Sequence, residues 1–166
     1  MTKIPNRTIV KTVVGILLAL LTGEAVSRRV FSFKLAYDPT LEVFVFAPGE
    51  SVRYRLEGDG ISKWSAHGVR GNGLPADGAP DSIIVLGDSF TESVQVSDEE
   101  VYTTLLEAKL HENGIRNPVL NLGKSSCSLP DYIGLADRHR ALFRPAWTVV
   151  QVQESDFTTD AWNPSK

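Results

Sequence analysis

Residues 82–91 read Ser-Ile-Ile-Val-Leu-Gly-Asp-Ser-Phe-Thr, an uninterrupted apolar run that ends in a glycine and then polar residues. A run of this length without alternation is typical of a strand covered on both faces, as in parallel sheets flanked by helices. Gly87 permits a tight turn at the end of the strand, and Ser89 then lies at the rim of the sheet. The stretch therefore predicts an α/β domain with an accessible serine beyond its first parallel strand.

Two more helix-and-strand pairs follow this stretch. Strands are predicted over 117–122 and 147–152, with helices over 97–113 and 128–143 before them. Each helical segment starts with a serine that has an acidic residue three positions later, the pattern of a capping box. In such β-α-β units the carboxyl ends of all the parallel strands lie at one edge of the sheet.

The sequence before the α/β part has a different character. Residues 31–56 are rich in aromatic and β-branched residues and predict short strands, and 58–80 form a glycine-rich connector. The predicted organisation is a membrane anchor or signal segment over 1–30, a β-rich lead-in over 31–80, and the α/β part over 81–166.

The N-terminal segment has the pattern of a membrane-targeting sequence. Lys3, Arg7 and Lys11 precede the uncharged run 12–23, which is dominated by Val, Ile and Leu. A helix over this run alone is about 18 Å long, against roughly 30 Å for the hydrocarbon core, so an anchor needs the flanking residues too. We predict an uncleaved anchor with the domain on the extracytoplasmic side; a cleaved signal peptide and a buried soluble helix are the alternatives.

The composition excludes several classes of partner. With 17 basic and 20 acidic residues the net charge is −3, which does not indicate nucleic acid. Cys127 is the single cysteine, so this chain alone forms neither an intramolecular disulfide nor a cysteine-rich zinc site. No metal and no cofactor is predicted.

Three polar clusters follow the three predicted strands, at 87–91, 123–128 and 153–156. Because they follow parallel strands, we expect them to converge at one edge of the sheet. A serine at this edge is accessible to a substrate, and the backbone N–H groups of such turns can face a developing oxyanion.

The sequence of these clusters resembles the SGNH (GDSL-type) hydrolases. Residues 83–91 look like the first block of that family, 119–123 with the serines that follow are similar to the second, and 149–156 resemble the third. Residues 66–71, Ala-His-Gly-Val-Arg-Gly, look like the lead-in of membrane-anchored members. The resemblance implies a three-layer α/β/α fold with a flavodoxin-like parallel sheet, of which this chain holds the N-terminal part.

The resemblance also implies roles for single residues. Ser89 is the nucleophile, and Asp88 supports its turn. The oxyanion and binding positions are the backbone N–H groups of Ser89 and Ser126, the Ser155 side chain, and Gly123. Two of these positions depart from the family pattern, because Ser126 replaces a glycine and Ser155 replaces an asparagine.

The general base of the family comes from an Asp-x-x-His element, which is not found in residues 1–166. We therefore expect a sequence truncated before that block and assign the base to no residue here. His67 in the connector, His111 at the end of the first helix and His139 inside the second are weak substitutes. Without a base, a serine site retains only a residual rate enhancement of about 10³ to 10⁴ over the reaction in water.

The function predicted is that of an ester hydrolase for an acylated small molecule or carbohydrate. Two alternatives keep the same serine and fold: a non-catalytic, membrane-tethered glycan-binding module, and an O-acyltransferase that passes the acyl group to a sugar hydroxyl. Less favoured are Cys127 as a nucleophile at a helix N-terminus, Asp88 as a phosphatase nucleophile, and Glu154 with Asp156 as a metal pair rather than solvated rim residues.

Overall fold

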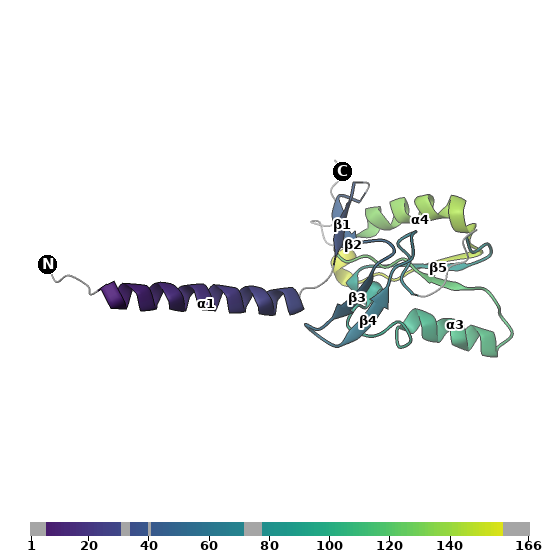
Figure 1. Cartoon of the computed structure of the whole chain (residues 1–166). Coiled ribbons are helices and arrows are strands. Elements are labelled where there is room, and N and C mark those ends of the chain that lie inside the picture. Colours follow the sequence, from purple (N-terminus) through teal and green to yellow (C-terminus); the bar gives the residue numbers. More distant parts are fainter. Residues whose placement is uncertain (1–5, 31–33, 40, 72–77, 158–166) are drawn as a thin grey trace. The chain divides into compact units, whose positions relative to one another are not determined.

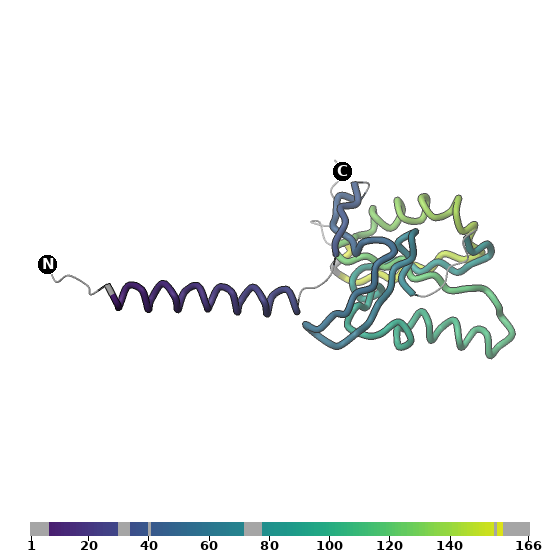
Figure 2. Tube along the Cα trace, viewed as in Figure 1, coloured from purple at the N-terminus to yellow at the C-terminus, as the bar shows by residue number. Residues whose placement is uncertain are grey.

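The computed structural model describes residues 6–30, 34–39, 41–71 and 78–157 (Figures 1 and 2). The chain divides into two compact units, Met1–Ser32 and Phe33–Lys166. The first unit holds one apolar helix. The second combines helices and strands around a small parallel sheet, so that the β-rich lead-in and the sheet belong to the same unit.

The N-terminal helix α1 spans Asn6–Val30 and is longer than the apolar run of the sequence suggests. Its 25 residues make a helix about 37 Å long, which exceeds the roughly 30 Å of a bilayer core. Its Val, Ile and Leu side chains are exposed within the unit. The helix is therefore long and apolar enough to be a membrane anchor or a signal sequence.

Two antiparallel hairpins precede the parallel sheet. Strand β1 (Leu35–Asp38) pairs with β2 (Val43–Phe46), and β3 (Ser51–Tyr54) pairs with β4 (Gly60–Lys63). The first three strands confirm the prediction for 31–56. The fourth lies in the segment predicted as a connector, so the prediction was wrong there.

Gly60 is the reason that the fourth strand was predicted as a loop. A Cβ atom at this position would lie 2.5 Å from the carbonyl oxygens of both Val94 and Val96. The strand therefore needs a glycine where the backbone of another segment approaches, although glycine is normally a sign of a loop.

The parallel sheet has the order β6-β5-β7. Strand β5 (Ile83–Leu86) is central and pairs in parallel with β6 (Val119–Asn121) and β7 (Trp147–Val150), which confirms the three predicted strands. All four residues of β5 are buried, as the continuous apolar run predicts. All four residues of β7 are exposed, so the described lead-in does not cover that edge of the sheet.

Four further helical segments connect and follow these strands. The short helix α2 (Ser89–Glu92) and α3 (Tyr102–Glu112) lie between β5 and β6, α4 (Leu129–Phe143) precedes β7, and a 3₁₀ turn, η1, spans Glu154–Phe157. Helices α3 and α4 lie on opposite sides of β5 (Figure 1).

The two predicted capping boxes have different outcomes. Ser128 and Asp131 form theirs at the start of α4, which confirms that helix. The box predicted at Ser97 is wrong, because α3 begins five residues later and the Ser97 hydroxyl instead accepts a hydrogen bond from the Ile61 N–H at 3.2 Å. A tertiary contact with β4 has replaced the local cap.

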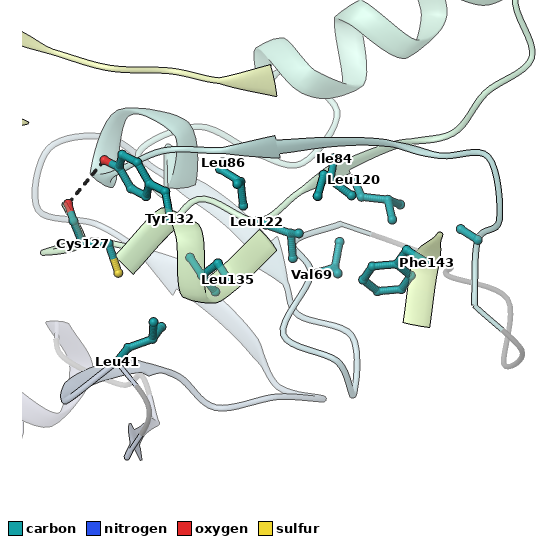
Figure 3. Close-up of a cluster of buried hydrophobic side chains, with 11 residues drawn as sticks. Leu41, Val69, Ile84, Leu86, Leu120, Leu122, Cys127, Tyr132, Leu135 and Phe143 are labelled. Atoms are coloured by element: carbon teal, nitrogen blue, oxygen red, sulfur yellow. Dashed lines mark hydrogen bonds between the residues drawn. The ribbon is translucent and has the colours of Figure 1, made fainter. Parts of the chain in front are cut away.

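The main apolar core lies between β5 and α4 (Figure 3). Ile84 and Leu86 of β5 meet Leu135 and Phe143 of α4, and all four are at most 1% exposed. Burying a side chain of this size contributes about 1.5–3 kcal/mol relative to leaving it exposed. The core therefore holds α4 on the sheet and with it the loop that leads into the helix.

Arg70 connects the lead-in to the sheet. Its backbone N–H donates to the Asn121 carbonyl at 3.0 Å, beside the edge of β6. Its buried guanidinium pairs with Asp98 at 2.9 Å and donates to the carbonyl oxygens of Glu92 and Val96. A buried cation is stable only when its donors are used, so Arg70 holds the segment after α2 against β6.

Replacing Arg70 with Met should destabilise the fold strongly. It leaves Asp98 buried without its cation, and breaking a buried pair costs about 3–5 kcal/mol. Urea denaturation of the full chain in detergent micelles measures the effect. Lys109→Met is the control, because the Lys109–Glu112 pair is exposed and its loss should leave the unfolding midpoint unchanged. Equal midpoints for the two variants would contradict the role given to Arg70.

Arginines placed in the middle of α1 should release the chain from membranes. We expect the wild-type chain to stay in the membrane fraction after alkaline carbonate extraction. The double variant Leu17→Arg, Leu18→Arg should move to the soluble fraction, because each charge costs about 2.5–3.5 kcal/mol at the bilayer centre. Leu17→Ile with Leu18→Ile is the matched control. The mass of the extracted chain separates an anchor from a cleaved signal.

Candidate active site

The exits of the three parallel strands are bonded to one another. The Lys124 N–H donates to the Gly87 carbonyl at 2.9 Å, and the Gln151 N–H donates to the Leu86 carbonyl at 2.9 Å. The polar clusters that follow β6 and β7 therefore lie beside the cluster that holds Ser89, as the parallel arrangement predicts.

Asp88 supports the turn that presents Ser89. As the N-cap of α2 its carboxylate accepts the Phe90 N–H at 2.9 Å, and the Gln153 side-chain amide donates to its other oxygen. Ser89 itself is half-buried, and its carbonyl accepts the Ser93 N–H at 2.8 Å. The serine is thus held in the first turn of a short helix at the carboxyl end of β5.

Two glycines let α2 approach the sheet closely. A Cβ atom on Gly87 would lie 2.1 Å from Thr91 Oγ1, and one on Gly123 would lie 2.4 Å from the Glu92 nitrogen. The Gly123 N–H is donated to Asn121 Oδ1 at 2.9 Å. The Gly123 N–H is thus already used, and the position serves close packing, while the binding role of Gly123 stays a prediction.

A hydrogen-bond network behind α2, buried at Thr91, Thr103 and Asn121, was not predicted. Thr91 Oγ1 donates to Gln151 Oε1 at 2.6 Å, and the Tyr102 hydroxyl reaches the same oxygen at 3.1 Å. The Asn121 amide donates to the Thr91 carbonyl at 2.7 Å and to Thr103 Oγ1 at 3.2 Å. The one sequence signal for this network is Asn121, a polar residue inside an otherwise apolar strand.

Glu92 holds the loop that carries Ser126. Its side chain is buried, with the residue 1% exposed, and its carboxylate accepts the N–H of Ser125 at 2.9 Å and the Ser125 hydroxyl. Ser126 follows with a φ of 67°, exposed to solvent. No described residue accepts the backbone N–H of Ser89 or of Ser126, so both groups can donate to a ligand.

The third cluster is partly structural. Asp156 is 7% exposed and accepts the Gln153 N–H at 2.8 Å and the Tyr132 hydroxyl at 3.5 Å. This corrects the prediction that Asp156 is a solvated rim residue, whereas Glu154 is exposed. Burial, and then the charge of Asp156, raise the pKa of Tyr132, which remains a donor. The backbone of Ser155 lies in η1, and its side chain is outside the described part.

None of the three histidines hydrogen-bonds to Ser89. The His67 side chain is exposed, and its ring meets Phe143 edge to face at 6.2 Å. His139 is buried in α4, with Nδ1 2.8 Å from the Leu135 carbonyl, and burial lowers its pKa. His111 lies in the last turn of α3. Over residues 6–30, 34–39, 41–71 and 78–157, no group of three or more His, Cys, Asp and Glu could hold a metal ion.

Cys127 is an unreactive thiol rather than a nucleophile. The residue is 5% exposed, and burial, followed by the charge of Asp131, raises its pKa to about 12 although Lys124 acts in the opposite direction. The raised pKa argues against the less favoured interpretation of Cys127 as a nucleophile at the start of α4, because desolvation of the thiolate outweighs the helix terminus.

Comparisons of the chain with protein-family models, with curated proteins and with solved structures found no match. The chemistry of this site therefore rests on the residues themselves.

The folded chain should resist alkylation at Cys127. At pH 8.5 iodoacetamide should leave the native thiol unmodified and modify it fully in denaturant, because only the unfolded chain forms the thiolate. The thiol introduced by Lys109→Cys on the surface is the positive control, read by peptide mass. Because the folded pKa is raised, stability relative to Cys127→Ala should fall as the pH rises from 9.0 toward about 12. Native alkylation of Cys127 at the control rate would contradict this assignment.

Proposed function

We propose that Ser89 is the nucleophile of an SGNH-type ester hydrolase site, directed at an acylated small molecule or carbohydrate. The observation that carries the proposal is the pair of unused backbone donors, Ser89 N–H and Ser126 N–H, on adjacent turns at the carboxyl edge of the parallel sheet. We further propose that α1 holds the chain at a membrane with the site on the extracytoplasmic side.

The strand order supports the finer fold assignment. In β6-β5-β7 the first parallel strand of the chain is central and the next two flank it, which is the 2-1-3 order at one side of a flavodoxin-like sheet. Helices on both sides of β5 agree with a three-layer α/β/α arrangement (Figure 1). We therefore propose that these strands are the beginning of an SGNH-type sheet.

The proposed reaction follows from the donors and the hydroxyl. Ser89 Oγ attacks the acyl carbonyl while the N–H groups of Ser89 and Ser126 stabilise the oxyanion, each donor of this kind contributing about 3 kcal/mol. The alcohol leaves, and water or an acceptor hydroxyl then takes the acyl group. The Ser89 proton needs a base, and no described histidine hydrogen-bonds to Ser89. The site should therefore accelerate the reaction by at most about 10³ to 10⁴ over the rate in water.

The positions of the histidines favour one second candidate, a membrane-tethered module that binds acylated glycans without cleaving them. His139 is buried in α4 and bonds to backbone carbonyls, and His111 lies in the last turn of α3; neither hydrogen-bonds to the serine. In that case Ser89 contributes a hydrogen bond to the ligand instead of a covalent bond.

Labelling with a fluorophosphonate separates the two candidates. We expect the full chain in detergent micelles to form an adduct on Ser89, at a slow rate because the base is lacking, and Ser89→Ala to form none. Ser93→Ala is the matched control, since Ser93 lies at the other end of α2 and donates to the Phe90 carbonyl. Added imidazole, an external base, should accelerate labelling of the wild type.

If no Ser89 adduct forms with or without imidazole, the proposal that Ser89 is a nucleophile is rejected. The glycan-binding module then remains as the candidate function. If an adduct forms, product analysis with and without an acceptor alcohol distinguishes hydrolysis from acyl transfer. Ester turnover well above the level expected without a base would contradict the claim that no described residue serves as one.

A further inference from the structure

A cavity of about 290 Å³ lies between β2, the loop around His67 and α4, and it shares no lining residue with the Ser89 turn. Part of its wall is apolar, with Phe46, Leu135 and Leu142, and Lys124 contributes to the rest. At roughly 30 Å³ per water molecule, the space holds about ten waters or one small organic molecule.

Lys124 is the unusual group in this wall. The residue is 5% exposed, and its ammonium donates to the Gly68 carbonyl at 2.7 Å. An ammonium has three donors, and within the described residues the Gly68 oxygen is the one acceptor and no carboxylate forms an ion pair with it. Burying a cation with unused donors costs free energy unless a ligand or a water molecule accepts hydrogen bonds from them.

Of the other charged or titratable groups of the wall, Asp38, Arg138 and His139 are hydrogen-bonded, and the His67 side chain is exposed. Arg138 binds Asp38 through two hydrogen bonds, at 2.5 and 3.0 Å. The ring nitrogens of His139 face two backbone carbonyls, those of Leu135 and His67, and burial lowers the pKa of this histidine. Lys124 is therefore the lysine or arginine of the wall that has no carboxylate partner among the described residues.

We propose that this cavity binds a small organic anion, with a carboxylate or phosphate group on Lys124 Nζ and an apolar body against Phe46, Leu135 and Leu142. The anionic oxygens accept the donors that Gly68 does not use, and the apolar wall excludes water around this pair. The site is separate from Ser89, so it does not depend on the proposed hydrolase function.

Burial and the neighbouring charges act in opposite directions on the protonation of Lys124. Burial lowers its pKa, and the charges of Glu92, Cys127 and Asp38 oppose that shift. An anion beside Nζ favours the charged ammonium in the same way, so ligand binding and protonation of Lys124 support one another.

Titration of the ¹⁵N-labelled full chain in detergent micelles tests the site with three probes of similar size. Benzoate carries a carboxylate, phenyl phosphate a phosphate, and benzamide is the uncharged analogue of benzoate. We expect saturable shifts of the Gly68, Lys124 and His139 amide signals with benzoate or phenyl phosphate and none with benzamide. The anion that binds with the lower Kd shows whether the site prefers a carboxylate or a phosphate group. No saturable shift with either anion, or equal shifts with benzamide, would overturn the proposal.

Substitutions locate the binding on Lys124. Lys124→Met should weaken anion binding at least about tenfold, as expected for the loss of a charge-assisted hydrogen bond, and the exposed Lys109→Met should not. Ala66 is an exposed residue of the cavity lining. The bulky side chain of Ala66→Trp should occupy the cavity while leaving Lys124 in place, and should also abolish binding, which tests the site if Lys124→Met does not fold. Ser89→Ala should bind as the wild type does. Unchanged binding in the Ala66 variant would contradict the location.

Discussion

The buried guanidinium of Arg70 is the interaction on which the arrangement of the second unit depends. It lies where three segments meet: the loop after β4, the edge of β6 at Asn121, and the segment that follows α2. A buried guanidinium is stable only when acceptors surround it, and Asp98 with two backbone carbonyls accepts one hydrogen bond from each of its three nitrogens. The described part of the lead-in is therefore an integral part of the α/β unit.

This arrangement determines the construction of the site around Ser89. The segment held by Arg70 ends α2, and Glu92 at that end holds the loop of Ser125 through its carboxylate. Gly87 and Gly123 allow the helix to lie directly on the strand exits. The two backbone donors proposed for the oxyanion are thus positioned by contacts of Glu92, Gly87 and Gly123.

The sequence predicted the three parallel strands and α4 well, because each shows a local signal. Continuous apolar runs mark the strands, and the Ser128 capping box marks the start of the helix. The prediction from sequence failed where a tertiary contact gives a residue a different role from the one that its local preference indicates. Ser97 bonds to β4 instead of capping α3, and Gly60 stands in a strand because another backbone approaches it. The same holds for Asp156, which is a buried acceptor of its turn.

The sequence by itself determined that α1 is apolar enough to cross a membrane, that β5 is covered on both faces, and that Ser89 follows it in a tight turn. These properties follow from composition and periodicity within short segments. Only the tertiary structure decided which donors around Ser89 are unused, that Cys127 is desolvated, and that Lys124 is buried beside a cavity. Desolvation and hydrogen-bond satisfaction depend on neighbours that are distant along the chain, so no local pattern encodes them.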